Sequence, residues 1–104
     1  MQFFTEQIIR VISRIPAGKV LTYGAVAAMA GNNRGARQVS RVLHSMSGKY
    51  GLPWHRVIGA KGKISLPAGE GREEQLFLLE REGVRAGENG TICLEKFLWN
   101  GGDG

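Results

Sequence analysis

The feature that most constrains the fold is a pair of helix patterns joined by a tight turn. Thr22 is a typical helix N-cap, and the alanine-rich stretch after it predicts a helix over residues 23–29. Residues 31–33, Gly-Asn-Asn, predict a turn, and a second helix is expected from Arg34 or Gly35 to about Ser47. A short helix, a turn containing glycine and a longer helix together indicate a helix-turn-helix.

The second of these helices has two chemically different faces. Its apolar side consists of Val39, Val42, Leu43 and Met46. Its other side consists of Arg34, Arg37, Gln38, Arg41 and His44, with no acidic residue. Arginine bonds both phosphates and base edges, so this face is typical of a helix that enters a DNA groove. The alternative is a solvated helix in a small bundle.

Two further helices are expected around this pair. Thr5 is the expected cap of a helix that runs to about Ile15, with an apolar face that Pro16-Ala17-Gly18 brings to an end. That face consists of Phe4, Ile8, Val11, Ile12 and Ile15. Residues 72–82 predict another helix, with Leu76 and Leu79 buried and Gly83 just past its end.

The remaining segments predict small elements. Val57-Ile58 and residues 64–66, separated by Gly59 to Gly62, are expected to form a hairpin wing beside the helices. Within residues 91–99, Phe97, Leu98 and Trp99 are expected to pack on the core. The fold class is therefore mainly α: one helix-turn-helix or winged-helix-like domain over residues 1–100, followed by a disordered tail, 101–104.

The stretch Leu52-Pro53-Trp54-His55-Arg56-Val57-Ile58 sets an indole, an imidazole and a guanidinium directly after a proline. Proline fixes its own φ and keeps the preceding residue extended, so Trp54 is presented from a stiff turn. An aromatic side chain beside a DNA-reading helix indicates base stacking. The alternative is that Trp54 is a core residue and His55 a satisfied buried polar group.

Composition narrows the function classes. A chain of 104 residues predicts one domain, and a net charge of +5 with a pI of about 9.9 favours an anionic partner, nucleic acid first. The single cysteine, Cys93, excludes an internal disulfide and fits a reducing cytosol, so a cytoplasmic protein is expected. No apolar run approaches the length of a membrane span, so no membrane partner is expected.

Metal and cofactor chemistry is not expected. His44, His55 and Cys93 give no metal-ligand spacing, and the chain has no phosphate-binding loop. Nucleophilic catalysis needs a thiol, hydroxyl or amine beside a base. His55 is a candidate base that Glu82 would orient, but its neighbour is Trp54, whose indole N–H is only a donor. Cys93 lies in an apolar segment, where a thiol usually serves packing.

Four stretches follow one another along the chain: Gly18-Lys19-Val20-Leu21-Thr22-Tyr23-Gly24, Gly35-Ala36-Arg37-Gln38-Val39, Pro53-Trp54-His55-Arg56-Val57-Ile58 and Leu79-Glu80-Arg81-Glu82-Gly83. In this order they resemble the DNA-binding domain of O6-alkylguanine-DNA alkyltransferases, over roughly residues 3 to 85. In the enzymes the third motif reads Pro-Cys-His-Arg, and that cysteine accepts the alkyl group. Because Trp54 stands there, the chain resembles the alkyltransferase-like proteins, which bind alkylated DNA without repairing it.

The resemblance implies roles for individual positions. Tyr23 would push on the phosphate of the flipped nucleotide, Arg37 would fill the space that the base leaves, and Trp54 would form the floor of the lesion pocket. The implied DNA-binding and base-flipping residues are Thr22, Tyr23, Arg37, Gln38 and Arg41. The implied pocket residues are Trp54, Val57, Ser65, Leu66 and Pro67, and the implied supporting residues are Pro53, His55, Arg56 and Glu82. An asparagine of the enzymes' hydrogen-bond relay falls at Met46 by ungapped spacing.

The sequence therefore predicts a non-enzymatic sensor of O6-alkylguanine in double-stranded DNA. The resemblance further implies a monomer that uses no cofactor, acts in the cytoplasm (on the nucleoid if the source is bacterial) and marks lesions for nucleotide excision repair proteins. Three alternatives remain: a sequence-specific helix-turn-helix regulator reading DNA through Arg37, Gln38 and Arg41, an active alkyltransferase, which the missing motif cysteine disfavours, and a small interaction module.

Overall fold

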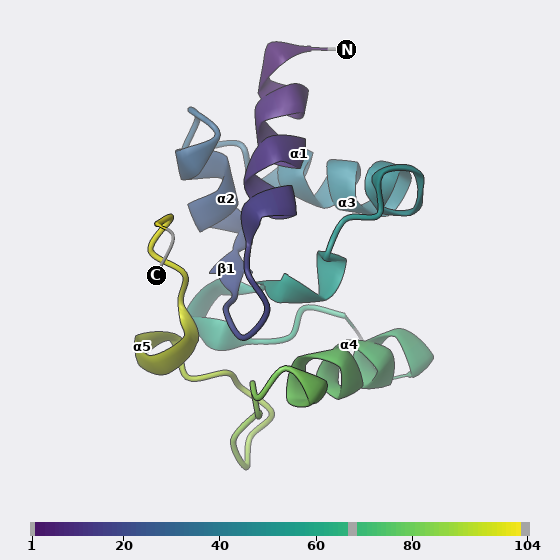
Figure 1. Ribbon diagram of the computed structural model, residues 1–104, viewed down its shortest axis with the longest axis vertical. Coiled ribbons are helices and arrows are strands. Elements are labelled where there is room, and N and C mark those ends of the chain that lie inside the picture. Colours follow the sequence, from purple (N-terminus) through teal and green to yellow (C-terminus); the bar gives the residue numbers. More distant parts are fainter. Residues whose placement is uncertain (1, 67–68, 103–104) are drawn as a thin grey trace.

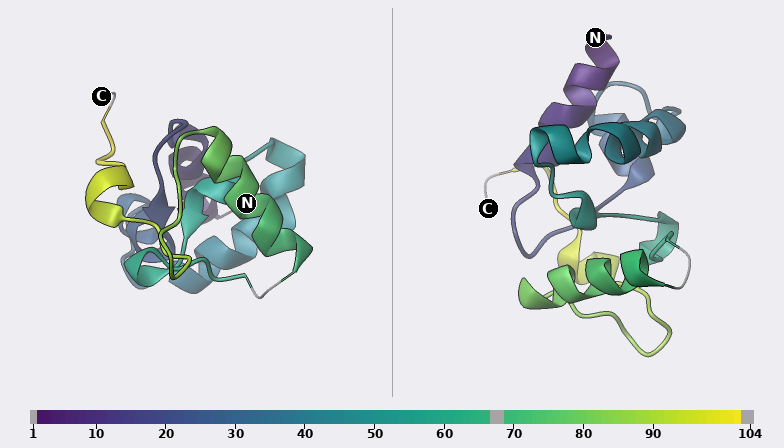
Figure 2. Two further views of the ribbon diagram at one scale, coloured as in Figure 1. Left: turned by 90° about the horizontal axis from the view of Figure 1, so that it is seen from below. Right: turned by 90° about the vertical axis from the view of Figure 1, so that its right-hand side faces the viewer.

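Helices account for most of the chain, as the sequence predicts. The structure is a computed structural model that describes residues 2–66 and 69–102. The elements follow in the order α1 (Phe3–Arg14), β1 (Leu21–Thr22), α2 (Tyr23–Met29), α3 (Ala36–Tyr50), the 3-10 turn η1 (Trp54–Arg56), β2 (Val57–Ile58), the 3-10 turn η2 (Ala60–Gly62), α4 (Glu70–Arg81) and α5 (Leu94–Phe97). Figures 1 and 2 show α1, α2 and α3 on one side of the short strands, with α4 and α5 on the other. The expected fold class, mainly α with a helix-turn-helix, is confirmed.

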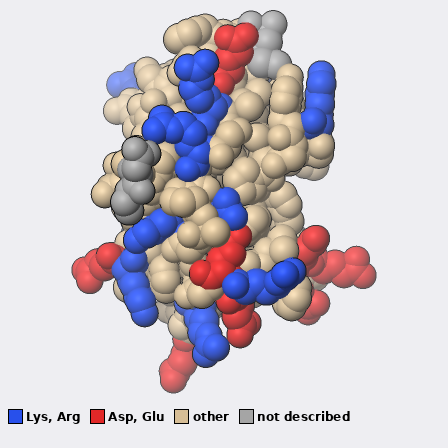
Figure 3. Space-filling model, viewed as in Figure 1, with Lys and Arg blue, Asp and Glu red and all other residues tan. Residues whose placement is uncertain are grey.

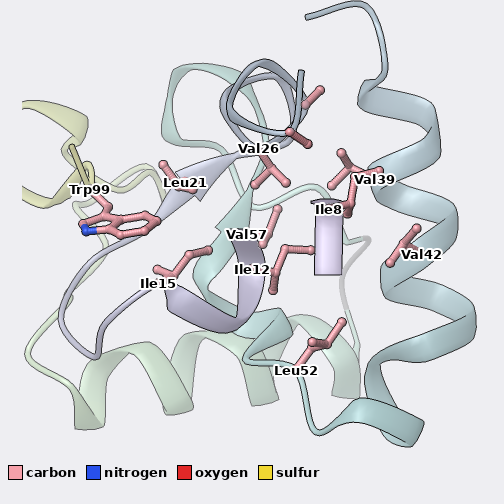
Figure 4. Packing of buried hydrophobic residues seen from close by; sticks show 12 residues of the cluster. Ile8, Ile12, Ile15, Leu21, Val26, Val39, Val42, Leu52, Val57 and Trp99 are labelled. Atoms are coloured by element: carbon pink, nitrogen blue, oxygen red, sulfur yellow. The ribbon is translucent and has the colours of Figure 1, made fainter. Parts of the chain in front are cut away.

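Two clusters of buried apolar side chains lie on opposite sides of the strand pair. Strands β1 and β2 are parallel, with Leu21 opposite Val57. Because successive side chains of a strand point to opposite faces, Leu21 and Val57 enter the cluster of α1, α2 and α3, while Val20 and Ile58 enter the cluster above α4. Figure 4 shows the first cluster, with Val39 of α3 pointing toward the side chains of α1.

The helix-turn-helix forms where its local signals predict it. The Thr22 hydroxyl accepts a hydrogen bond from the Ala25 N–H at 3.1 Å and caps α2. On α3 the apolar side faces the first cluster and the basic side is exposed, as expected. Helix α3 ends at Tyr50, beyond the expected Ser47, so the loop starts later than the sequence indicates. Gly51 ends the helix because its φ of 60° is a left-handed conformation that glycine adopts without strain.

The start of α1 differs from the sequence expectation. Thr5 lies inside the helix, and the N-cap is Gln2, which makes no side-chain cap bond, so the expected Thr5 cap is wrong. The first turn of the helix carries Phe4, whose ring packs on the first cluster, close to Gly35, where a Cβ atom would collide with the ring. The expected apolar face is confirmed, with Ile8, Ile12 and Ile15 buried.

The hairpin wing expected over residues 57–66 is wrong. Strand β2 pairs with β1 instead, and both of its residues are buried, as parallel strands covered on both faces are. The Gly59 N–H donates to the Lys63 carbonyl at 2.6 Å and closes a turn around η2. Lys63 then forms an antiparallel bridge with Thr91, a distant segment that the sequence pattern does not connect to it.

The C-terminal segment packs on the core through alternate residues. The Trp99 N–H donates to the Val20 carbonyl, and the Trp99 side chain is buried, as expected. Leu98 is 43% exposed, so its expected packing on the core is wrong, because the extended backbone there turns neighbouring side chains to opposite sides. The Trp99 indole N–H donates to the Gly102 carbonyl, and residues 103–104 of the expected tail lie outside the described residues.

Helix α4 starts at Glu70, earlier than expected, and ends before Gly83, whose φ is 87°. Leu79 is buried as expected, whereas Leu76 is only partly buried. In residues 2–66 and 69–102, none of the helices has the length and apolarity that crossing a membrane requires.

Candidate functional site

A cavity of about 340 Å³ opens where α2, α3, η1, β2 and α4 meet. Its lining residues are Tyr23, Ser40, Leu43, His44, Ser47, Trp54, Val57, Leu66 and Gln75. Four of them, Tyr23, Trp54, Val57 and Leu66, are residues that the sequence analysis assigns to lesion binding or flipping. Segments far apart in the sequence therefore bring these side chains to one place.

The polar wall of the cavity was only partly found by the sequence analysis, which placed His44 on the basic side of this helix but missed Ser40 and Ser47. Ser40, His44 and Ser47 recur at intervals of four and three residues, so they share one side of α3. That spacing, beside the basic face, is the signal that identifies them. Gln75 of α4 was also missed, because nothing local distinguishes it from an exposed helix residue, yet it is only 3% exposed.

A second hollow of about 430 Å³ adjoins the cavity. Its lining includes Arg37 and Ser65, and it shares Tyr23, Ser40 and Leu66 with the cavity. The Tyr23 hydroxyl and Ser65 Oγ are hydrogen-bonded at 2.9 Å. Arg37, the expected finger, is thus exposed at the edge of the expected lesion pocket, and Ser65 lines this outer hollow and not the cavity itself.

The other predicted residues lie around this region. Gln38 and Arg41 are exposed on α3, outside both linings, and Thr22 caps α2. Pro67, expected in the pocket, lies outside the described residues. Pro53 precedes η1 with a φ of −75° and so sets the direction in which Trp54 emerges.

Trp54 lies in the wall of the cavity and only partly in the protein interior. Its side chain is half-buried and lines the cavity, so the alternative that makes it a core residue is wrong. The Trp54 and His55 rings are 6.2 Å apart and nearly perpendicular, at 84°. Consecutive side chains of η1 therefore diverge: Trp54 faces the cavity and His55 faces the end of α4.

Glu82 joins three segments on the far side of η1: the end of α4, η1 itself and the loop around Gly18. Its carboxylate accepts from Arg56 Nη2 at 2.6 Å and from Arg56 Nε at 3.0 Å, and it is hydrogen-bonded to His55 Nε2 at 2.9 Å. The Gly18 N–H donates to the same carboxylate at 3.3 Å, and Arg56 Nη1 donates to the Ile15 carbonyl at 2.8 Å. The sequence predicts the His55–Glu82 pair, but Arg56 makes the closest contact.

Glu82 stays ionised because of these donors. Burial by itself raises the pKa of the Glu82 carboxyl, but the hydrogen bonds from Arg56, His55 and the Gly18 N–H outweigh it and lower that pKa from 4.5 to about 2. The side chains of Glu82, His55 and Arg56 are only 12% to 18% exposed. The cluster is therefore a clamp in which the Arg56 and His55 side chains are both directed at the Glu82 carboxylate.

The single thiol of the chain does not line the cavity. Cys93 is exposed, so its expected packing role is wrong, and it lines a different hollow together with Arg85, Lys96 and Phe97. Throughout the described ranges, no three His, Cys, Asp or Glu side chains lie close enough together to hold a metal ion.

Comparison with known proteins assigns the family. The model of the 6-O-methylguanine DNA methyltransferase DNA-binding domain matches residues 3–84. The chain belongs to this family. A relative from Vibrio parahaemolyticus named DNA base-flipping protein is 46% identical over 99 residues, which cover 95% of this chain and 98% of the relative.

A fungal relative is similar over nearly its whole length. Alkyltransferase-like protein 1 of Schizosaccharomyces pombe is 34% identical, covering 95% of this chain and 96% of the relative. The crystal structure of S. pombe Atl1 in complex with damaged DNA containing O6-carboxymethylguanine matches with a TM-score of 0.80 and 33% identity, covering 96% of this chain and 97% of the other. The resemblance drawn from the sequence motifs is therefore confirmed.

Proposed function

We propose that this protein is a non-enzymatic sensor of DNA damage, which binds O6-alkylguanine in duplex DNA by flipping the modified base into the cavity beside Trp54. The observation that carries the proposal is that this indole lines the cavity. The motif resemblance implies that the enzymes carry their acceptor cysteine at this position. The names of the Vibrio and S. pombe relatives, and the damaged DNA bound to S. pombe Atl1, support the same function.

Helix α3 supplies the DNA contacts in this proposal. Its exposed face carries Arg37 and Arg41 and no acidic side chain, and Arg34 is exposed just before the helix begins at Ala36. Arginines and backbone N–H groups bind phosphates and hold a protein in register on the duplex. Because Arg37 also borders the hollow next to the cavity, it is placed to enter the space from which a base has rotated out.

The energies of flipping and binding are of similar size. Extruding a base costs a few kcal/mol, and less when damage has already weakened its pairing. Stacking a base on an aromatic side chain contributes roughly 1–3 kcal/mol. A damaged base is cheaper to extrude, and Trp54 contacts both the base and its alkyl group. Together these two contributions give a preference for lesions. This preference requires no contact that is specific to the surrounding DNA sequence.

Alkyl transfer is not part of the proposed function. Transfer needs a thiolate near the alkyl carbon, and the only cysteine lines another hollow. The His55–Glu82 pair therefore has no thiol to activate. A complex without chemistry persists on the DNA, and we propose that nucleotide excision repair proteins act on that persistent complex, in the cytoplasm, with the sensor present as a monomer.

Binding to matched duplexes tests the proposal. The affinity for a duplex with one O6-methylguanine should exceed that for the same duplex with guanine by about tenfold, because the damaged base is extruded more cheaply and its alkyl group adds a contact with Trp54. Intact-protein mass spectrometry after incubation should show no added methyl group. Equal affinity for the two duplexes would overturn the sensor function, and a methylated Cys93 would overturn the absence of transfer.

The role of Arg37 has a separate test. Arg37→Ala should weaken binding to the O6-methylguanine duplex by about tenfold, because it removes both a phosphate-seeking charge and the group that occupies the emptied stack. Arg85→Ala, which removes an exposed arginine distant from α3, is the control. Similar losses in the two variants would mean that Arg37 acts only as a surface charge.

A further inference from the structure

Phe77 is an exposed aromatic residue at the centre of the outer face of α4. It is 59% exposed, and helical spacing places it on the side of the helix opposite to the buried residues Gln75 and Leu79. Figures 1 and 2 show α4 at the end of the molecule opposite to α1. In the described part of the chain, therefore, this face of the helix carries an aromatic ring that water surrounds.

The Phe77 ring has a recess beside it. The next residue, Leu78, lines a hollow of about 310 Å³ together with His55, Arg81 and Glu82. The Arg81 guanidinium lies 5.8 Å from the centre of the Phe77 ring, so the ring and the hollow adjoin through Arg81. An aromatic residue at the centre of a patch is typical of the residues that contribute most to a protein–protein interface.

Exposed carboxylates surround the ring on the same face. Helical spacing places them on both sides of it, and they belong to Glu70, Glu73, Glu74 and Glu80. Within the described residues, the carboxylate that forms ion pairs is that of Glu82, so no cation of the chain lies within ion-pair distance of these four. Together with the single cation of the face, Arg81, they leave a net charge of −3 in a chain whose net charge is +5.

Support of the helix explains only part of this surface. Acidic residues in the first turn stabilise a helix through its dipole, which accounts for Glu70 and Glu73. Glu80 lies in the last turn, where a negative charge is unfavourable. Phe77 leaves apolar surface in water, which is also unfavourable. The fold requires neither of these last two residues, whereas a docked partner accounts for both.

We propose that the outer face of α4 docks a protein partner that has an apolar pocket rimmed by lysine or arginine side chains. The inference rests on the proposed function and names the surface through which nucleotide excision repair proteins hold the lesion-bound sensor. Phe77 enters the pocket, and the surrounding carboxylates pair with its basic rim. Charge decides the class of occupant, because this face repels DNA and acidic proteins and attracts a basic protein surface.

DNA and the partner are held at the same time. The arginines of the DNA-binding face, Arg37 and Arg41, lie on α3, whereas Phe77 lies on α4. Figure 2 shows these two helices on different sides of the short strands. Docking on α4 therefore does not require release of the DNA, and the repair proteins reach a sensor that still marks the lesion.

Binding to purified repair proteins, measured without DNA, tests the docking surface. The probe is the set of damage-recognition proteins of nucleotide excision repair from the same organism, titrated onto the fluorescently labelled sensor. Phe77→Ser should weaken this binding by about tenfold, because it removes the central aromatic anchor. Phe3→Ser removes a ring from α1 that is 74% exposed, and it should leave the binding unchanged.

Charge reversal tests the carboxylates around the ring. Glu80→Lys should weaken the same binding several-fold and make the remaining binding less sensitive to salt. It improves the interaction of this residue with the helix dipole, so loss of folding does not explain a weaker affinity. Glu6→Lys makes the same charge change on α1 and should bind the repair proteins as wild type does. The two variants should bind the O6-methylguanine duplex equally well, because neither residue lines the cavity.

Three results would overturn the docking surface. The first is wild-type affinity for the repair proteins in either Phe77→Ser or Glu80→Lys. The second is no binding between the wild-type sensor and these proteins. The third is a dimer of the wild-type chain that Phe77→Ser dissociates, since a second copy would then occupy the face. Failure of the sensor function is seen separately, as equal affinity of the wild type for O6-methylguanine and guanine duplexes.

Discussion

The two sides of the η1 turn differ in whether their side chains already have partners within the chain. Trp54 faces an open cavity, while His55 and Arg56 are directed at Glu82 and held by short hydrogen bonds. Cys93 lines a different hollow, away from both sides of this turn. On one side His55, Arg56 and Glu82 form a clamp within the chain, and on the other side Trp54 lines the cavity.

Helices α3 and α4, on the two sides of the cavity, also differ in the charge of their exposed side chains. The exposed face of α3 holds arginines and no acidic residue, whereas α4 carries Glu70, Glu73, Glu74 and Glu80. Figure 3 shows acidic and basic side chains interleaved over the lower part of the molecule, where α4 lies. A mixed surface does not attract a polyanion as a purely basic one does. DNA is therefore expected on the α3 side of the cavity, with α4 behind it.

The largest effect is expected from removing the clamp. Glu82→Gln should lower the free energy of unfolding at pH 7 by about 3 kcal/mol, because Arg56 and His55 lose their common anion in a partly buried site. Urea denaturation measures this. Glu80→Gln, an exposed neighbour, should stay within about 0.5 kcal/mol of wild type. Equal stability of the two variants would mean that the clamp is not structural.

Acid should release the same clamp without a mutation. The pKa of Glu82 is lowered from 4.5 to about 2 on folding, so its stabilisation is fully present above pH 4.5 and is lost as the pH falls toward 2. Between pH 4.5 and pH 2.5 the stability difference between wild type and Glu82→Gln should shrink by about 2 kcal/mol. A difference that stays constant over this range would contradict the lowered pKa.

On the open side of the turn, substitution should affect binding more than folding. Trp54→Ala should weaken binding to the O6-methylguanine duplex by about tenfold, the contribution of one base–aromatic contact, and change binding to undamaged DNA less. Fluorescence anisotropy with the two duplexes measures this. Tyr50→Ala, an exposed aromatic at the end of α3 and outside the cavity lining, is the control. Equal losses on both duplexes would remove Trp54 from lesion recognition.

Local signals made the helices predictable. Thr22, the turn after α2 and the apolar spacing of α3 each act within a few residues, so the sequence alone locates the helix-turn-helix. The pairing of β2 with β1 was not predictable, because it joins Val57 to Leu21 and no short-range pattern specifies that partner. The predicted wing was wrong for this reason. Val57 and Ile58 could pair with residues 64–66, which are close in the sequence, or with the distant strand β1, and the sequence pattern favoured the closer segment.

The residues of the candidate site also fall into those with a local sequence signal and those without one. Trp54 and Arg37 lie in motifs that resemble a known family. Their roles are predictions that DNA-binding measurements test. Gln75 carries no such signal. Its partners are carbonyls 18 and 20 residues away, and only the packing of α4 against η1 makes its amide a buried group with a fixed orientation.

The smallest effect is expected at the N-cap of α2, where a substitution shows whether Thr22 only stabilises the helix or also contributes to lesion binding. Thr22→Ala removes the hydroxyl that caps α2 and should lower the free energy of unfolding by about 1 kcal/mol, while Thr22→Ser, which keeps the cap, should stay near wild type. Because the cap is an internal bond, both variants should retain the wild-type preference for O6-methylguanine over guanine. Loss of that preference in Thr22→Ala alone would show that the Thr22 hydroxyl positions Tyr23, the next residue, at the edge of the cavity. Lesion recognition would then depend on the cap of α2 as well as on the cavity.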